Sequence, residues 1–364
     1  MKNSFGNAIN ISLFGESHGA GVGVLIDGIA PGIKVDGDFI AHQLTLRRPS
    51  ESISTSRREP DEYVIQSGVY NGYTTGAPLC IFIPNTDTRS RDYTPDLPRP
   101  SHADFTAREK YHGFEDYRGG GHFSGRLTAA LVAAGAIVIP ALREKGIYIG
   151  TYIKEIGQII LGEEDHTAEN LLAIAESKYG LTDPDSVNMM KQVIEYARKR
   201  TDSVGGVLET AIVGLPAGLG EPWFDGVESQ IARAVFGIPA VKSVAFGAER
   251  INVMRGSEAN DEFAIKDGKI VTETNNSGGV QGGITNGMPV VFRTAIKPTP
   301  SIARYQKTVN MATLEETELN IKGRHDPCIV PRARIVVDSV AALVVADMLT
   351  VRYGSDALSE KVQK

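Results

Sequence analysis

The chain has 364 residues, of which 41% are hydrophobic and 23% are charged, and its formal net charge is −6. These values are typical of a globular protein, and an acidic chain does not favour binding to nucleic acid or to an anionic membrane through its overall charge. Two cysteines, Cys80 and Cys328, are too few for a disulfide framework. Because such a chain suits a reducing compartment and begins without a signal-peptide pattern, we expect a cytoplasmic protein.

In chain order, the pattern predicts strands, then helices, then strands and a last helix. Strands are expected at 21–29, 63–70 and 77–83, each bounded by turn residues. An Ala-rich helix is expected at 124–142, with Pro140 near its end. It is shorter than the roughly 20 residues of a membrane span, so we interpret it as buried. Helices at 167–178 and 185–201 are expected to follow, then strands at 204–216, 240–249 and 287–296, and a helix at about 339–352 after "RARIVV".

This order lacks the regular alternation of strand and helix that is typical of a doubly wound sheet. Each half has a strand-rich part that leads to an arginine-rich motif and an apolar helix, so the halves are loosely alike, without a repeat in register. No linker rich in Ser, Pro and Gly divides the chain. We therefore predict one compact α+β domain over residues 1–364, with helices packed between or against sheets.

Four of the seven histidines lie in loops rich in Gly, Ser, Arg or Asp, namely His18, His102, His122 and His325. A single histidine is more often a surface or core residue, but four in such loops favour proton transfer near neutral pH. None has the spacing to another His or Cys that is typical of a zinc site, so no metal is predicted.

Arginines gather in the same loops. They are Arg47, Arg48, Arg57, Arg58, Arg89, Arg91, Arg99, Arg118, Arg126, Arg324, Arg332 and Arg334. Guanidinium groups bind carboxylate and phosphate through paired hydrogen bonds. In an acidic protein these clusters favour a pocket for a molecule with several negative charges, although any one arginine fits an ion-paired surface equally well.

The stretch "YRGGGHFSGRLT" (117–128) is a partial match to a P-loop. Arg126 and Leu127 replace the Lys and the Ser or Thr of that motif, and no buried strand precedes it, so we do not predict an NTPase. Nor is "GAGVG" (19–23) a dinucleotide fingerprint. The glycines and the helix N-terminus offer backbone N–H groups and a favourable helix dipole, which can bind an anion. A plain turn with Ser124 as the N-cap fits the same residues. Composition and spacing alone thus indicate an anion-binding enzyme with several histidines.

Taken together, the motifs resemble the chorismate synthase family over nearly the whole chain. "LFGESHG" (13–19) and "GRHDPC" (323–328) are similar to two family signatures, and 117–126 stands where the family has its Gly-rich loop. Between these lie, in family order, "REPDE" (58–62), "SGVYNGYTTGAP" (67–78), "RPSHADF" (99–105), "DSVGG" (202–206), "GLPAGLGEP" (214–222), "GSEANDEF" (256–263), "GGVQGGITNG" (278–287) and "KPTPSI" (297–302).

The resemblance implies a β-α-β sandwich with pseudo-symmetric halves, in which helices pack between two antiparallel sheets, and a homotetramer. It implies a lyase of the shikimate pathway, which serves aromatic amino-acid biosynthesis. The implied reaction converts 5-enolpyruvylshikimate 3-phosphate to chorismate and phosphate by a 1,4-anti elimination, with reduced FMN as the obligatory cofactor. A substrate with two carboxylates and a phosphate, beside a cofactor with another phosphate, accounts for the arginine clusters.

The resemblance also implies roles for individual residues. His18 would protonate the leaving phosphate, His102 would keep the reduced flavin suitably protonated, and Asp326 would assist at the flavin N5. The implied substrate-binding residues are Ser17, Arg47, Arg48, Arg99 and Arg126. The implied cofactor-binding residues are His122, Phe123, Ser124, Ala240, Gly282, Lys297, Pro298, Thr299, Pro300, Ser301 and Arg324.

The chain departs from the family pattern at several of these positions. Leu46 and Ile53 stand where the family has arginines, and Pro300 stands where it often has serine. His122 and Phe123 replace an Arg-Ser pair, and Gly125 and Leu127 replace Ala and Glu. We predict that His122 takes over the lost arginine contact; Arg57 and Arg58 are the other candidates.

Two other functions remain open at this stage. A flavin-binding or phosphometabolite-binding protein without catalysis would keep the glycines and arginines, but the presence of His18, His102 and Asp326 argues against it. A bifunctional enzyme that also reduces its own flavin with NADPH is not excluded by any motif, although no added reductase segment is evident.

Overall fold

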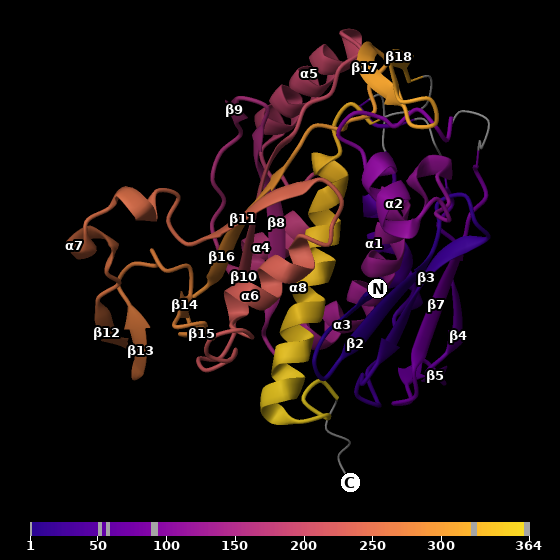
Figure 1. Cartoon of the computed structure of the whole chain (residues 1–364). Helices are drawn as coiled ribbons and strands as arrows, with labels where there is room; N and C mark the ends of the chain where they lie inside the picture. Colours follow the sequence, from indigo (N-terminus) through magenta and orange to yellow (C-terminus); the bar gives the residue numbers. More distant parts are fainter. Residues whose placement is uncertain (1, 50–52, 56–58, 89–93, 322–325, 360–364) are drawn as a thin grey trace.

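The structure is a computed structural model that describes residues 2–49, 53–55, 59–88, 94–321 and 326–359. Two five-stranded sheets, one from each half of the chain, lie on either side of two long helices (Figure 1). All the strand pairs described are antiparallel. This arrangement confirms the predicted α+β sandwich with helices between two antiparallel sheets.

The first sheet has the strand order β1-β2-β3-β7-β4. Its strands are β1 (Ser4–Phe5), β2 (Asn10–Gly15), β3 (Gly21–Asp27), β7 (Leu79–Pro84) and β4 (Val64–Ser67). Alternation in β7 buries Leu79, Ile81 and Ile83 on one face. Successive side chains of a strand point to opposite faces, so this period-two pattern orients one face of the sheet toward the helices.

The second sheet has the strand order β11-β16-β10-β8-β9. Its strands are β11 (Val241–Phe246), β16 (Val290–Ile296), β10 (Gly206–Val213), β8 (Tyr148–Ile156) and β9 (Ile159–Ile160). Most residues of β8 and β10 are buried, which indicates that both faces of these central strands are covered.

The central layer contains α3 (Thr128–Glu144) and α8 (Val330–Tyr353), which pack against each other. Helix α3 also contacts β3 and β7, and α8 contacts β8 and β10, so the two helices join the sheets into one core. Within the described residues, the stretch Gly125–Glu144 is the one helical segment long and apolar enough to cross a membrane. Because 83% of its most apolar 18-residue window is buried inside the protein, it is a core helix here.

The remaining helices surround this core. They are α1 (Gly37–Arg47), α2 (Asp104–Tyr111), α4 (Ala168–Glu176), α5 (Pro184–Lys199), α6 (Val227–Val235) and α7 (Gly256–Ala259), with the 3-10 turns η2 (Arg118–Phe123), η3 (Gly125–Leu127) and η4 (Ile251–Val253). Four two-stranded hairpins complete the described fold: β5–β6 (Val69–Tyr70, Tyr73–Thr74), β12–β13 (Phe263–Lys266, Lys269–Thr272), β14–β15 (Val280–Gln281, Ile284–Thr285) and β17–β18 (Tyr305–Asn310, Glu315–Asn320).

Two predicted elements were wrong in their extent. The last helix begins at Val330, nine residues before the predicted start, because Arg334 and Asp338 form a buried i,i+4 ion pair that lets charged residues lie inside it. Pro331 fits because the first turn of a helix tolerates proline. The strand predicted at 63–70 is two strands of different sheets, β4 and β5, since the chain turns at Gly68.

Candidate active site

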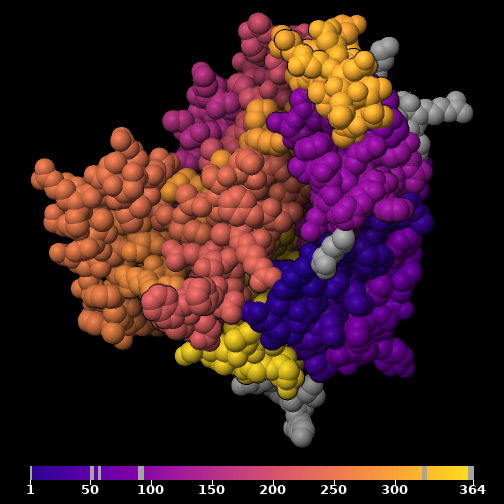
Figure 2. Space-filling view, viewed as in Figure 1, coloured from indigo at the N-terminus to yellow at the C-terminus, as the bar shows by residue number. Residues whose placement is uncertain are grey.

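A cavity of about 1020 Å³ lies between the two halves of the chain. Its walls come from the first half through α1, α2 and the Gly-rich loop, and from the second half through 233–241, 297–301 and α8. In the space-filling view the first half (indigo to purple) and the second half (orange) lie side by side (Figure 2). Ligand pockets usually measure roughly 300–1,000 Å³, so this one is large enough for more than one small molecule.

Most of the predicted site residues line this cavity. They are Arg47, Arg99, His102, His122, Phe123, Ser124, Arg126, Ala240, Lys297, Thr299, Pro300, Ser301 and Asp326. Four described residues of the prediction, Ser17, His18, Arg48 and Pro298, are next to lining residues in the sequence or in space. Gly282 lies instead in the turn of the β14–β15 hairpin and does not line the cavity. Arg324 is outside the described residues, as are Arg57 and Arg58.

The Gly-rich loop brings the two predicted catalytic histidines to one place. Gly119 and Gly120 have φ angles of 62° and 81°, which favour glycine. A Cβ atom at Gly119 would lie 2.2 Å from Cε1 of His18, and one at Gly120 would lie 3.0 Å from Cε1 of His102. The loop backbone therefore passes against both imidazole rings. Gly119 leaves no room for a Cβ beside His18, and a Cβ at Gly120 would require the His102 ring to shift slightly.

The loop is also tied to the turn that carries His18. Ser17 N–H donates to the Gly121 carbonyl at 3.0 Å, and Nδ1 of His122 is 2.9 Å from the Gly15 carbonyl oxygen. Since a carbonyl only accepts, Nδ1 of His122 carries the hydrogen. A neutral His122 therefore has an acceptor at Nε2, and Nε2 donates to an anion only when the ring is protonated.

Ser124 ends this loop and caps the helical turn that follows. Its hydroxyl accepts from the Arg126 N–H at 3.3 Å, which confirms the N-cap interpretation of this serine. The same side chain faces the cavity, so capping and ligand binding are compatible.

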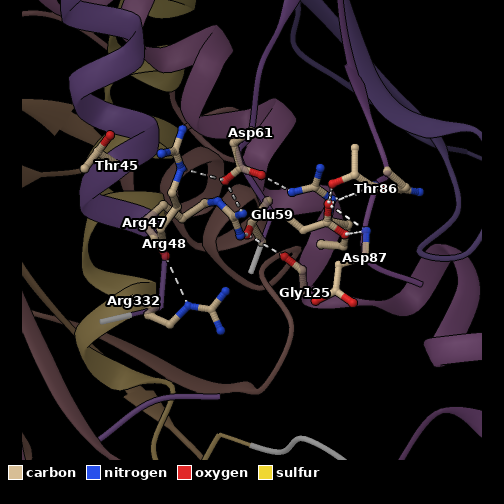
Figure 3. Close-up of polar contacts among 12 residues, drawn as sticks. Thr45, Arg47, Arg48, Glu59, Asp61, Thr86, Asp87, Gly125 and Arg332 are labelled. Atoms are coloured by element: carbon tan, nitrogen blue, oxygen red, sulfur yellow. Dashed lines mark hydrogen bonds and ion pairs between the residues drawn. The ribbon is translucent and has the colours of Figure 1, made fainter. Parts of the chain in front are cut away.

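A buried carboxylate organises the arginines at one end of the cavity. Asp61 accepts from Arg47 Nη2 at 2.8 Å and from Arg126 Nη1, and Arg48 Nε lies 3.8 Å away. Figure 3 shows Asp61 beside Arg47 and Arg48. Burial by itself raises the pKa of Asp61, but the two guanidinium groups outweigh it and lower that pKa, so the carboxylate stays ionised.

A second carboxylate, Asp326, is held in the same region. It accepts from Arg332 Nη1 at 2.5 Å and from the Thr55 N–H at 2.7 Å. Arg332 in turn donates through Nε to the Arg47 carbonyl at 3.1 Å, a contact visible in Figure 3. Asp326 is therefore linked through Arg332 to the Asp61 cluster.

The segment after β16 forms the opposite wall. The Lys297 N–H donates to the carbonyl of Ala240, whose φ of 73° is unusual for a residue with a side chain. Lys297 Nζ donates to the Ser101 carbonyl at 2.6 Å, and Ser203 donates to the Thr299 carbonyl at 2.7 Å. These bonds bring the predicted cofactor segment next to His102, which follows Ser101. Burial, with a contribution from Lys242, lowers the pKa of Lys297.

Sequence reasoning missed three acidic residues of this site, Glu59, Asp61 and Asp104, although it placed Arg332 in an arginine cluster. Glu59 accepts from the Thr86 N–H and hydroxyl at 2.9 Å, which anchors the loop after β7 (Figure 3). Asp104 binds Arg99 and His102. The signal was present, because these acids lie inside "REPDE" and "RPSHADF", but only the folded structure pairs Asp61 and Asp104 with arginines and Glu59 with Thr86.

A family model, similar sequences and a solved structure all point to the same protein family. The family model described as chorismate synthase matches residues 9–350. The chain is 48% identical over 350 residues to a chorismate synthase of Pyrococcus abyssi, covering 95% of this chain and 97% of that one. It is 46% identical to a chorismate synthase of Chitinophaga pinensis, covering 97% and 98% of the two chains. A solved crystal structure of a chorismate synthase superposes with a TM-score of 0.75 at 31% identity, covering 96% of this chain and 94% of the other.

Proposed function

Since the chain belongs to the chorismate synthase family and is a lyase of the shikimate pathway, we propose that it converts 5-enolpyruvylshikimate 3-phosphate to chorismate and phosphate with reduced FMN. The observation that carries this proposal is the convergence of His18 and His102 on one Gly-rich loop beside a cavity that contains several arginines. The substrate has three anionic groups, and such a cavity can bind them while two imidazoles stand close to the bound molecule.

The proposed roles follow from the residues and their contacts. The Arg47, Arg48 and Arg126 cluster binds anionic groups of the substrate, with Asp61 holding the guanidinium groups in position. His18, when protonated, gives its proton to an oxygen of the departing phosphate. Asp326, which is oriented by its bonds to Arg332 and Thr55, would assist at N5 of the flavin. His102 would keep the reduced flavin suitably protonated.

The cavity suits a flavin mononucleotide as well as the substrate. Apolar side chains from α3 and α8, including Leu131, Val336, Val340 and Leu343, offer a surface for an aromatic ring system. The Oγ1 atom of Thr299 is buried and has no hydrogen-bond partner among the described residues, which favours a polar ligand there. We propose that Ala240, Lys297 to Ser301, and His122 to Ser124 hold the cofactor. When bound there, reduced FMN would supply electron density for the elimination.

The proposal includes the organisation of the protein. We propose that residues 1–364 form a single domain that works as a cytoplasmic homotetramer. Large apolar side chains are exposed on the part of the second half that projects from the core in Figure 1, including Phe263, Ile265 and Ile270 of β12–β13. Apolar surface of this kind favours subunit contact. Light scattering coupled to size exclusion measures the mass of the assembly, and a monomer would contradict the tetramer.

The function is tested anaerobically with purified protein, photoreduced FMN and 5-enolpyruvylshikimate 3-phosphate. We expect chorismate absorbance and phosphate to appear together, and we expect no turnover with oxidised FMN. If FMN and substrate both bind but neither product forms, the chain is a binding protein and the proposed reaction is wrong.

A further inference from the structure

Asp104, at the start of α2, contacts two predicted site residues at once. Its Oδ2 accepts from the backbone N–H of Arg99 at 2.9 Å and from Arg99 Nε at 2.8 Å. Its Oδ1 lies 2.7 Å from Arg99 Nη2 and 2.6 Å from Nδ1 of His102. Arg99 and His102 line the cavity, whereas Asp104 lies behind them.

These distances determine which ring nitrogen of a neutral His102, Nδ1 or Nε2, carries the hydrogen. Arg99 Nη2 is also 3.1 Å from Nδ1, so an unprotonated Nδ1 could accept from the guanidinium. That arrangement would place the Nδ1 lone pair 2.6 Å from an anionic oxygen, which is repulsive. The favourable arrangement has Nδ1–H donating to Asp104, so that the neutral ring has its acceptor at Nε2.

The ionised form of Asp104 is well stabilised. Burial by itself raises the pKa of this carboxyl, but hydrogen bonds from Arg99 and His102 outweigh it and hold the pKa well below its usual range. An ionised carboxylate only accepts, so the direction of the bond from Nδ1 does not change near neutral pH.

The other side of the ring faces the Gly-rich loop. A Cβ atom at Gly120 would lie 3.0 Å from Cε1 and 3.2 Å from Nε2 of His102. Asp104 thus holds Nδ1 on one side, and the loop leaves room for Nε2 on the other.

A capping role for Asp104 does not account for these contacts. The N-cap of α2 is Ala103, which makes no side-chain cap, and the side-chain hydrogen bonds described for Asp104 go to Arg99 and His102. Asp104 thus joins two cavity residues to each other.

We propose that Asp104 is a positioning residue that fixes the Nδ1–H form of His102 and holds Arg99 beside it. The inference rests on the proposed function in one respect, that His102 and Arg99 belong to the reaction site. Asp104 touches neither substrate nor cofactor in this proposal and acts through its two neighbours.

The test uses the full chain labelled with ¹⁵N-histidine and free of ligand. Solid-state ¹⁵N spectra distinguish the two neutral imidazole forms, and the His102 signals are identified by their absence in His102→Gln. We expect Nδ1–H in the wild type. In Asp104→Asn we expect a mixture or the Nε2–H form, because an amide can donate to Nδ1. In serine proteases the corresponding change gives the wrong imidazole form and lowers kcat by roughly 10⁴.

Asp96→Asn is the matched control. Asp96 forms a 2.9 Å ion pair with Arg108 in the same region, but it is half-exposed and does not line the cavity. The control should keep the Nδ1–H form of His102 and near-normal turnover. We expect Asp104→Asn to lower kcat on the order of 10² or more, as loss of a correctly oriented acid–base group does.

The outcomes separate this inference from the proposed function. An Nε2–H form of His102 in the wild type overturns the inference, even if Asp104→Asn does not fold. An unchanged Nδ1–H form in a folded Asp104→Asn also overturns it. A wild type that shows no turnover contradicts the proposed function, whereas the change of imidazole form in Asp104→Asn would still support the pairing of Asp104 with His102.

Discussion

The Asp61 carboxylate lies 2.8 Å from the Arg47 guanidinium, and its side chain has no exposed surface. Arg126, which is also buried, shares the same carboxylate. Arginines predicted to bind substrate anions therefore already have an anionic partner within the protein. This pairing keeps two guanidinium groups close together at the cavity wall before any ligand binds, although their like charges repel.

Asp61→Asn tests this relationship. Removing one partner of a buried ion pair leaves uncompensated charge, so we expect the free energy of unfolding to fall by about 3 kcal/mol. Inorganic phosphate should then stabilise the variant more than the wild type, because the anion can replace the missing carboxylate. Urea denaturation with phosphate, and with chloride at matched ionic strength, measures both effects. An equal phosphate effect on the two proteins would mean that anions do not reach Arg47 and Arg126.

Gly119→Ala tests whether the loop must lie against His18. The new Cβ would be 2.2 Å from the His18 ring, so the ring or the loop must move. Gly113→Ala is a matched control, since Gly113 has a φ of 79° but a Cβ added there would meet no atom within 4 Å. Both variants should lose about 1 kcal/mol of stability to the left-handed backbone. Only Gly119→Ala should also lose activity, on the order of 10², through misplacement of the catalytic group. Equal activity in the two variants would contradict the proposed position of His18.

His18→Ala tests the general acid itself. We expect turnover to fall by a factor on the order of 10² or more, the usual contribution of such a group. His42→Ala is the control, because His42 pairs with Glu176 at a half-exposed position and does not line the cavity. Phosphate release measures the rate in each variant. A near-normal rate in His18→Ala would assign the proton transfer to another group.

Much of the fold could be predicted from local pattern. The strands at 77–83 and 240–249 and the helix at 124–142 correspond to β7, β11 and α3. Apolar residues alternate in β7, and α3 is a long Ala-rich run that is buried on most sides. The start of α8 could not be predicted. Its Arg334 and Asp338 are both fully buried, and the benefit of pairing them arises only when the helix is packed in the core.

The site was predictable as a set of residues but not as a geometry. His18 and His102 are far apart in the sequence, and their approach depends on Gly119, Gly120 and the bond from Ser17 to Gly121. No spacing rule encodes such tertiary contacts. For the same reason, the motif pattern identified Arg47 and Arg99 as ligands for anions and gave no sign that Asp61 and Asp104 already bind them.

The resemblance predicts an arginine where this chain has His122, and this difference leads to a further prediction. His122 lines the cavity, and its Nδ1 donates to Gly15, so its Nε2 can donate to an anion only as an imidazolium. We expect His122→Ala to weaken the binding of substrate or FMN about tenfold, the value of one charge-assisted hydrogen bond. Isothermal titration calorimetry measures both affinities. If both affinities remain unchanged, His122 does not replace the arginine, and Arg57 and Arg58 become the residues to test.

A last prediction concerns a buried charge cluster away from the cavity. Glu209 on β10 accepts from the Tyr152 hydroxyl and lies 3.3 Å from Lys154 Nζ and 3.4 Å from Arg293 Nη1. Burial by itself raises the pKa of Glu209, but the neighbouring His166, Tyr152 and Lys154 side chains outweigh it and lower that pKa to about 2. A carboxyl whose pKa is lower in the folded state contributes stability above its unfolded pKa and loses it as the pH falls toward its folded value.

For Glu209 this stability is lost as the pH falls from about 4.5 to about 2. Between pH 7 and pH 4 the wild type should therefore lose about 1 kcal/mol of unfolding free energy from this group. Glu209→Gln cannot titrate, so it should lack this contribution to the pH dependence, although it should be less stable than the wild type at pH 7. Urea denaturation at the two pH values measures the difference. Parallel stability profiles for the two proteins would mean that Glu209 has the same pKa in the folded and unfolded chains.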